Sequence, residues 1–145
     1  MTDNQDDIPI GVTALHKIDN HINSCVSGII IWDSAWWGKG IASAAHLGRT
    51  LFAADYLNRF TIKSQARVEN TASCKALERA GYSLYCTVPL SARRAGRWLD
   101  TNQYIWINPD MLPILFPAGV PDQYSPGIER AREALFTARQ AVEFP

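Results

Sequence analysis

A glycine-bearing loop between a β-branched run and an amphipathic segment is the feature that most restricts this sequence. The run Cys25–Trp32 (CVSGIIIW) predicts a buried, central strand, and WGKGIA (residues 37–42) leads from it into a helix expected over about residues 40–55. The first turn of a helix has amide hydrogens without partners and a partial positive charge, and glycines let an anion approach the main chain. The loop therefore predicts a binding site for a phosphate or diphosphate.

The loop differs from the two common nucleotide-binding motifs. In a Walker A loop a serine or threonine follows the lysine, whereas here GKG (residues 38–40) is followed by Ile41. The dinucleotide fingerprint GxGxxG needs a third glycine in register, and this sequence has none there. Nucleotide hydrolysis and NAD binding are therefore disfavoured.

Changes in hydrophobic periodicity predict the order of the remaining elements. The predicted strands cover residues 8–18, 25–32, 60–67, 82–90 and 103–108, and the predicted helices cover 40–55, 71–80 and 126–143. The turn-forming residues 19–24 predict a hairpin between the first two strands. A strand, a helix and a strand imply a right-handed crossover, so the strands at 25–32 and 60–67 are expected to run parallel. The sequence therefore predicts an α/β fold with a mixed sheet.

The ends of the chain have a different composition from the middle. Residues 1–7 are polar and acidic and predict a disordered leader, and the domain is expected to span 8–108. A charged, irregular loop is expected over 91–101, and the proline-rich stretch 109–125 predicts a linker. The apolar stripe of the last helix is expected to dock on the domain.

Composition limits the classes of partner and compartment. Fourteen Lys and Arg balance fourteen Asp and Glu, so nucleic acid is not an expected partner. The longest apolar run is far shorter than a membrane-spanning helix, which predicts no membrane association and a cytoplasmic protein. Cys25, Cys74 and Cys86 have no paired or metal-binding spacing, so no metal is expected and all three are expected in the core. His46 is expected to face solvent.

Two motifs resemble those of one enzyme family. The pattern Trp37-x-x-Gly40-x-Ala42 resembles the Q/R-x-x-G-x-G/A motif with which GNAT N-acetyltransferases bind acyl-CoA. The pattern N-x-x-S (residues 70–73), followed by a helix that ends in Gly-Tyr (residues 81–82), resembles the second signature of that family. The WWGKG wording and D-x-x-x-Y (residues 100–104) are most similar to the RimJ/RimL-like branch. The resemblance covers residues 8–108.

The resemblance implies a cofactor, a reaction and a set of site residues. It implies acetyl-CoA as co-substrate and a primary amine as acceptor, either a protein N-terminus or a small amine. It implies that the two parallel strands separate, that a bulge near residues 28–30 aims the amide of Ile29 or Ile30 at the thioester carbonyl, and that Ser73 meets the leaving thiolate. The residues implied to bind coenzyme A are Ile30, Ile31, Trp37, Gly38, Lys39, Gly40, Ile41, Ala42, Asn70 and Ser73.

Several positions depart from the family pattern. Leu77 stands where many relatives have a tyrosine that acts as general acid, so protonation of the thiolate would fall to Ser73, Cys74 or water. The candidates for a general base are His16, Asp33 and His21.

Relatives also have a strand-helix-helix-strand segment ahead of the strand at Ile8, which predicts a truncated acetyltransferase. The exposed sheet edge would then be covered by the last helix or by a second copy of the chain. A non-catalytic module that binds coenzyme A or another subunit is the alternative, and a nucleotide-binding signalling domain that prefers ATP is a second one.

Overall fold

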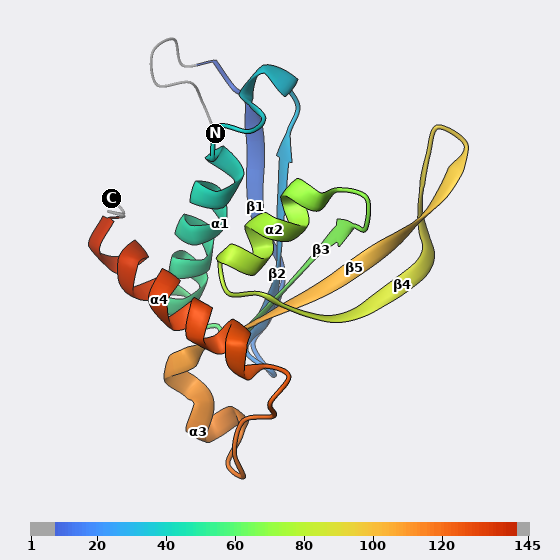
Figure 1. Ribbon diagram of the computed structural model, residues 1–145. Coiled ribbons are helices and arrows are strands. Elements are labelled where there is room, and N and C mark those ends of the chain that lie inside the picture. The colour runs from blue at the N-terminus through green and yellow to red at the C-terminus, as the bar shows by residue number, and fades with distance from the viewer. Residues whose placement is uncertain (1–7, 142–145) are drawn as a thin grey trace.

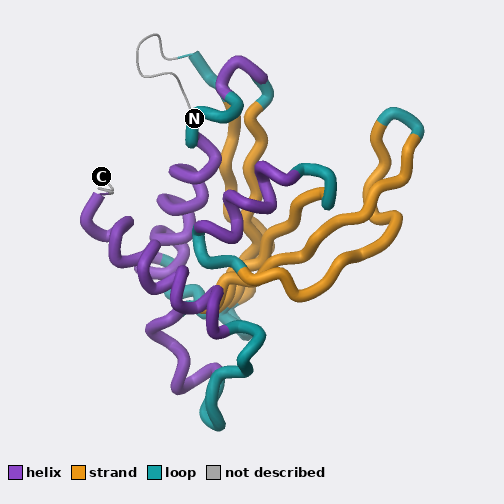
Figure 2. Tube along the Cα trace, viewed as in Figure 1, coloured by secondary structure: helices purple, strands orange, loops and turns teal. Residues whose placement is uncertain are grey.

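A mixed five-stranded sheet, with helices packed on one face, forms the part of the chain that this computed structural model describes, residues 8–141 (Figure 1). The strands are β1 (Gly11–Asp19), β2 (Ser24–Ile31), β3 (Thr61–Arg67), β4 (Ser83–Arg94) and β5 (Arg97–Ile107), in the spatial order β1-β2-β3-β5-β4. The α-helices are α1 (Ile41–Leu51), α2 (Thr71–Arg79), α3 (Leu112–Leu115) and α4 (Ser125–Ala141). Figure 2 shows α1, α2 and α4 gathered on the same side of the strands. The expected α/β fold is confirmed, and the predicted leader lies outside the described residues.

The apolar core lies between the sheet and these helices. Trp106 and Tyr104 from β5, Ile62 from β3 and Leu77 from α2 are almost completely buried there. Fully burying a large apolar side chain stabilises a fold by about 1.5–3 kcal/mol, so these few residues contribute much of the stability. None of the described helices is both long and apolar enough to cross a membrane.

Strands β2 and β3 run parallel, as expected, but they stay together only at one end. Ser24, Cys25 and Val26 pair with Thr61, Ile62 and Lys63, and no pair follows Val26–Lys63. The structure instead satisfies the next β2 carbonyls with side chains. Ser64 Oγ donates a hydrogen bond of 2.9 Å to the oxygen of residue 27, and Arg49 donates one of 3.0 Å to the oxygen of residue 28. The two strands therefore diverge from residue 27 onwards.

This divergence corrects two expectations about β2. The strand was expected to be buried, yet Ile30 is 62% exposed, because it lies with its partner Val12 on the face of the sheet that no helix covers and has lost β3 as a neighbour. The predicted bulge near residues 28–30 is also wrong. The β1–β2 register is continuous from Gly11–Ile31 to His16–Val26, and its irregularity comes only between His16 and Asp19. The opening of the sheet comes from the loss of β3, which leaves the β1–β2 pairing intact.

Helix α1 continues into a π-helical turn, η2 (Phe52–Tyr56), so the expected helix over 40–55 is present in two parts. Within it the expectation for His46 is wrong. The side chain of His46 is 2% exposed, because this face of α1 packs against β1 and β2 around Arg49.

Helix α4 docks on the core, as its apolar stripe predicts. Its buried residues include Ile128, Ala131 and Leu135. The chain at Gly81 approaches α4 so closely that a Cβ built there would lie 2.4 Å from the Cα of Ala131. The segment before α4 is less irregular than expected, because a 3-10 turn, η3 (Pro109–Met111), and the short α3 occupy residues 109–115. Both begin with proline in the first turn, where its missing N–H costs nothing.

The prediction of an irregular loop at residues 91–101 is wrong. Strands β4 and β5 form one long antiparallel ribbon whose register extends to Arg94–Arg97, and only residues 95 and 96 form the turn. Both turn residues have positive φ, 50° at Ala95 and 77° at Gly96, which suits a two-residue hairpin turn. The outer part of the ribbon is exposed on both faces, so its sequence does not alternate between apolar and polar residues. Cys86 lies on this ribbon and is exposed, contrary to its expected place in the core.

Candidate functional site

The glycine loop borders open space where it leads into α1. Gly38 and Gly40 have φ values of 74° and 78°, and a Cβ built at either would meet no atom within 4 Å. Gly40 is the N-cap of α1 and offers no side-chain acceptor. The first helical bond joins the amide of Ala44 to the oxygen of Gly40 at 3.0 Å, so the amides of residues 41–43 have no helical acceptor. This arrangement suits an anion at the loop.

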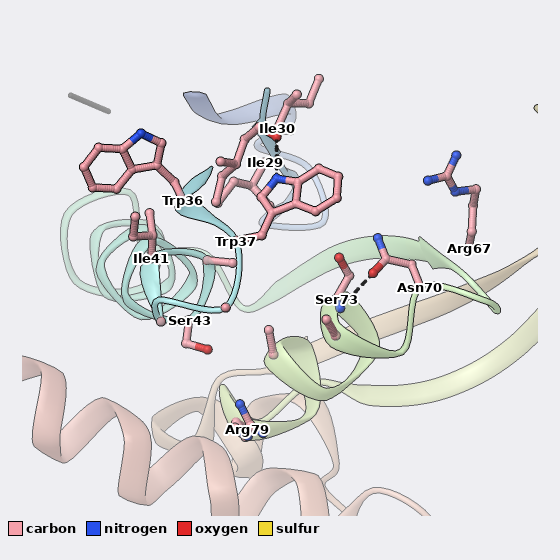
Figure 3. A pocket seen from close by; sticks show the side chains of 16 residues that line it. Ile29, Ile30, Trp36, Trp37, Ile41, Ser43, Arg67, Asn70, Ser73 and Arg79 are labelled. Atoms are coloured by element: carbon pink, nitrogen blue, oxygen red, sulfur yellow. Dashed lines mark hydrogen bonds between the residues drawn. The ribbon is translucent and has the colours of Figure 1, made fainter. Parts of the chain in front are cut away.

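Two tryptophans hold the loop in place. The indole Nε1 of Trp37 donates to the oxygen of Ile31 at 3.1 Å, which fastens the loop to the end of β2 (Figure 3). Trp37 is nevertheless 61% exposed. The ammonium of Lys39 lies 4.6 Å from the ring centroid of Trp36, a cation–π distance. Asp33 accepts a hydrogen bond from the amide of Ala35 at 2.9 Å and so caps the short 3-10 turn η1 (Ser34–Trp36).

The start of α2 faces the loop from the other side of the opening. Asn70 is the N-cap, and its Oδ1 accepts a hydrogen bond of 3.2 Å from the amide of Ser73 (Figure 3). The next residue, Cys74, is buried and its Sγ contacts the oxygen of Arg67 at 3.7 Å. Cys74 is therefore a structural thiol, and Asn70 and Ser73 are the polar groups presented to the opening.

A cavity of about 460 Å³ joins the loop, the diverging end of β2 and the start of α2. Ile29 and every residue implied to bind coenzyme A except Lys39 line it. The lining also includes residues that the sequence analysis did not name for the site, namely Trp36, Ser43, Arg67, Ala72, Ala76 and Arg79. Ala72, Ala76 and Arg79 recur at helical spacing along α2, so periodicity measured from Ala72, the neighbour of Ser73, could have found them.

A second cavity, of about 650 Å³, passes through the same gap, from His46 of α1 and Leu77 of α2 to the face of the sheet that these helices do not cover. We call it the open-face cleft. Val12, Ala14 and His16 line it from alternate positions of β1, and Lys63, Gln65 and Arg67 line it from alternate positions of β3. Ile29, Ile30, Arg67, Asn70 and Ser73 line both cavities. The two cavities therefore meet where β2 and β3 separate.

The candidate bases lie at different distances from this junction. His16 lines the open-face cleft, whereas Asp33 caps η1 and His21 lies in the turn between β1 and β2. Among the described residues no group of three or more His, Cys, Asp or Glu side chains is arranged to hold a metal ion.

A buried arginine fixes the edge of the opening. The guanidinium of Arg49, 6% exposed, donates to the carbonyl oxygen of Gly28, to Ser27 Oγ at 3.3 Å and to Thr13 Oγ1. It forms no ion pair with a described carboxylate, and burial lowers the pKa of this group from its ordinary value. Its Nη2 lies 2.5 Å from Nδ1 of His46. Neutral acceptors thus hold the cation beneath β2, at the point where β3 departs.

His46 is expected to make the fold sensitive to acid. Burial, and then the neighbouring charge of Arg49, lowers its pKa from 6.5 to about 3. Nδ1 can accept from Arg49 only while it is unprotonated. The unfolded chain takes up this proton below pH 6.5 and the folded chain does not. The contribution of His46 to stability is therefore fully present above pH 6.5 and is lost as the pH decreases towards 3, with a slope of about 1.4 kcal/mol per pH unit.

Urea unfolding between pH 7 and pH 4 measures this slope. We expect His46→Gln, which keeps a neutral acceptor for Arg49, to have a shallower acid slope than the parent protein. His21→Gln, in the exposed turn, is the matched control and keeps the parent slope. Equal slopes for His46→Gln and the parent would show that His46 is not the group responsible.

Comparison with known protein families identifies the family of this chain. Residues 1–83 match the family model described as an acetyltransferase (GNAT) domain, and they make up more than half of the chain. The chain belongs to the GNAT acetyltransferase family. The match contains the glycine loop and the Asn70–Ser73 motif, the two ends of the first cavity. A search of curated proteins found no significant match.

Solved acetyltransferase structures share the fold. A probable acetyltransferase superposes with a TM-score of 0.67 at 24% identity, over 72% of this chain and 59% of that chain. A mutant of the spermidine N-acetyltransferase SpeG from Vibrio cholerae gives 0.67 at 23% identity, over 82% and 68%. A GNAT-family acetyltransferase from Bacillus anthracis gives 0.63 at 19% identity, over 73% and 63%. The chain thus spans about three fifths to two thirds of the length of these acetyltransferases.

Proposed function

We propose that this protein transfers an acetyl group from acetyl-CoA to a primary amine. The observation that carries the proposal is the junction of two cavities at the gap between β2 and β3. One cavity ends at the glycine loop, and the other opens on the opposite face of the sheet. An acyl transferase needs such an arrangement, because its two substrates must reach one point from different sides.

The residues of the first cavity suit coenzyme A. The amides of residues 38–42 are directed at the diphosphate, where unpartnered N–H groups and the helix dipole favour negative charge. Beyond Val26 the main chain of β2 has no partner strand on the side of β3, and at Ile29 it offers hydrogen bonds to the pantetheine arm. Asn70 and Ser73 face this arm from α2. In this proposal Trp37 secures the loop and Lys39 adds positive charge near the phosphates.

Attack by the amine nitrogen on the thioester carbon forms a tetrahedral oxyanion, and the carbon–sulfur bond then breaks. We assign the oxyanion contact to the amide of Ile29, which lines the junction and lies on the same side of β2 as the Ser27 carbonyl that faces β3, whereas Ile30 pairs with Val12 of β1. One such preorganised donor lowers the barrier by about 3 kcal/mol. Ser73 lies at the same junction and is assigned to the departing thiolate. The proton lost by the amine goes to solvent or to His16, which lines the open-face cleft.

The finer assignment is to the RimJ/RimL-like branch, with a protein N-terminus or a small amine as acceptor. The WWGKG wording of the loop and the Asn70–Ser73 spacing support it. The SpeG structures named for spermidine acetylation have the same fold and are also consistent with an amine acceptor.

Calorimetry with coenzyme A, followed by release of free thiol from acetyl-CoA with a panel of amines, tests the proposal. We expect binding and amine-dependent thiol release. The amine must be neutral to attack, so the rate is expected to rise with pH until the pKa of the acceptor is passed. Binding with no release for any amine would favour a module that binds coenzyme A without catalysis. Tighter binding of ATP than of coenzyme A would overturn the assignment.

A further inference from the structure

The open-face cleft has an uneven distribution of charge. Lys17, Lys63 and Arg67 line it, and no aspartate or glutamate of residues 8–141, the part that the structure describes, does. The chain as a whole has equal numbers of acidic and basic residues, fourteen of each. The described lining of the cleft has three basic side chains and no acidic one, so the cleft is positively charged although the chain as a whole is neutral.

These three cations are not neutralised by neighbouring groups. The ion pairs among the described residues involve Arg97, Arg132 and Arg139, which lie outside the cleft. No described hydrogen bond or ion pair uses the ammonium of Lys17 or Lys63 or the guanidinium of Arg67. Figure 3 shows the guanidinium of Arg67 apart from the other labelled side chains, and Arg67 lines both cavities. The positive charge of the cleft is therefore available to a ligand.

The acidic residues closest in sequence to the cleft are engaged elsewhere. Asp19 accepts hydrogen bonds from the amides of His21 and Ile22 in the β1–β2 turn. Glu69 pairs with Arg97 at 2.8 Å, and the carboxylate of Asp100 accepts from the amide of Leu90 at 3.0 Å. None of these carboxylates lines the cleft.

The register of the strands places the positive groups beside the path to the junction. His16 pairs with Val26 across β1 and β2, and Val26 pairs with Lys63 across β2 and β3, so the three lie side by side on the open face. Arg67 lies two alternate positions further along the same face of β3, next to the gap. A molecule whose reactive end enters the gap would therefore have its other end close to Lys63 and Lys17.

We infer that the acceptor is a primary amine that also carries an anionic group, such as the carboxylate of an amino acid. This inference rests on the proposed function, because it names the substrate class of the same site. A second cationic group on the acceptor, as in a polyamine, would meet like charges at short range, whereas a carboxylate would meet three unpaired cations. Such charge matching selects among amines of equal length and leaves the chemistry of transfer unchanged.

Matched amines of equal chain length test the inference. We would measure kcat/KM by thiol release for ω-amino acids, n-alkylamines and α,ω-diamines with three to six carbons. We expect ω-amino acids to exceed alkylamines at least tenfold, diamines to be the poorest, and the preference to shrink in 0.5 M salt. Equal values, or a preference for diamines, would overturn the inference.

Charge reversal gives the matched variants. Lys63→Glu is expected to lower the preference for ω-amino acids at least tenfold. Lys75→Glu is the control, because Lys75 is exposed on α2 and lines neither cavity. An equal loss in both variants would show only a change of overall charge and would count against the inference.

A binding measurement separates failure of the substrate class from failure of the reaction. N-acetylated ω-amino acids and the corresponding N-alkylacetamides would be titrated into the protein without coenzyme A. We expect the charged compounds to bind at least tenfold more tightly, and Lys63→Glu to abolish the difference. Equal binding, or no binding of either, overturns the substrate class. Absence of coenzyme A binding and of thiol release with every amine overturns the proposed function.

Discussion

Gly81→Ala is expected to destabilise the protein by about 3 kcal/mol. A Cβ at this position would lie 2.4 Å from the Cα and 2.5 Å from the nitrogen of Ala131, so it would meet the main chain of α4. A main-chain atom cannot rotate away, and overpacking of this kind costs ~1–3 kcal/mol. The φ of Gly81 is 95°, which adds ~1 kcal/mol of backbone strain for a residue with a side chain. Urea unfolding would measure the loss.

Gly48→Ala is the control for this prediction. Gly48 lies inside α1, and a Cβ there would meet no atom within 4 Å. The substitution is therefore expected to stabilise the protein by ~0.5–1 kcal/mol, since alanine has the higher helix propensity. We also expect faster proteolysis within α4 of Gly81→Ala, because the helix must move outward. A free energy of unfolding within 1 kcal/mol of the parent would contradict the close packing at this position.

Gly40→Ala is expected to weaken coenzyme A binding at least tenfold, which is about 1.4 kcal/mol of binding free energy. The new methyl group would project from the N-cap of α1 beside the amides assigned to the diphosphate, and the φ of 78° would be strained for alanine. Calorimetry with coenzyme A is the measurement.

Gly96→Ala is the control for Gly40→Ala, because it introduces similar backbone strain at a position far from the proposed binding site. Gly96 has a φ of 77°, a Cβ there would also meet nothing within 4 Å, and it lies in the turn between β4 and β5. Gly96→Ala is therefore expected to lose similar stability and to keep the affinity of the parent for coenzyme A. Equal affinities of the two variants would refute the assignment of the loop to the diphosphate.

Periodicity and turn chemistry predicted most of the fold, because those signals come from single elements. The alternation at β1 and β3, the helical spacing along α2 and α4, and the glycine that ends α2 are visible in the sequence alone. The glycine loop and the Asn70–Ser73 motif also indicated the two ends of the cavity. Such local patterns survive because the buried face of each element has a repeat of its own.

The errors arose where one element depends on another that is distant in sequence. The strand at 25–32 was expected to be buried because the run is apolar, whereas Ile30 lies on the uncovered face of the sheet, where β3 has departed. His46 was expected in solvent because its partner, Arg49, is itself a residue usually found at the surface. The β4–β5 ribbon was missed because a strand exposed on both faces has no hydrophobic alternation.

The separation of β2 from β3 is built into the resting fold. The oxygens of Ser27 and Gly28 already accept hydrogen bonds from Ser64 and Arg49. Further pairing of β2 with β3 would therefore gain little hydrogen-bond free energy. The gap is therefore already open before a ligand binds, and binding breaks no β2–β3 hydrogen bonds. Entry should therefore be fast and insensitive to the stability of the sheet, as expected for a preorganised slot.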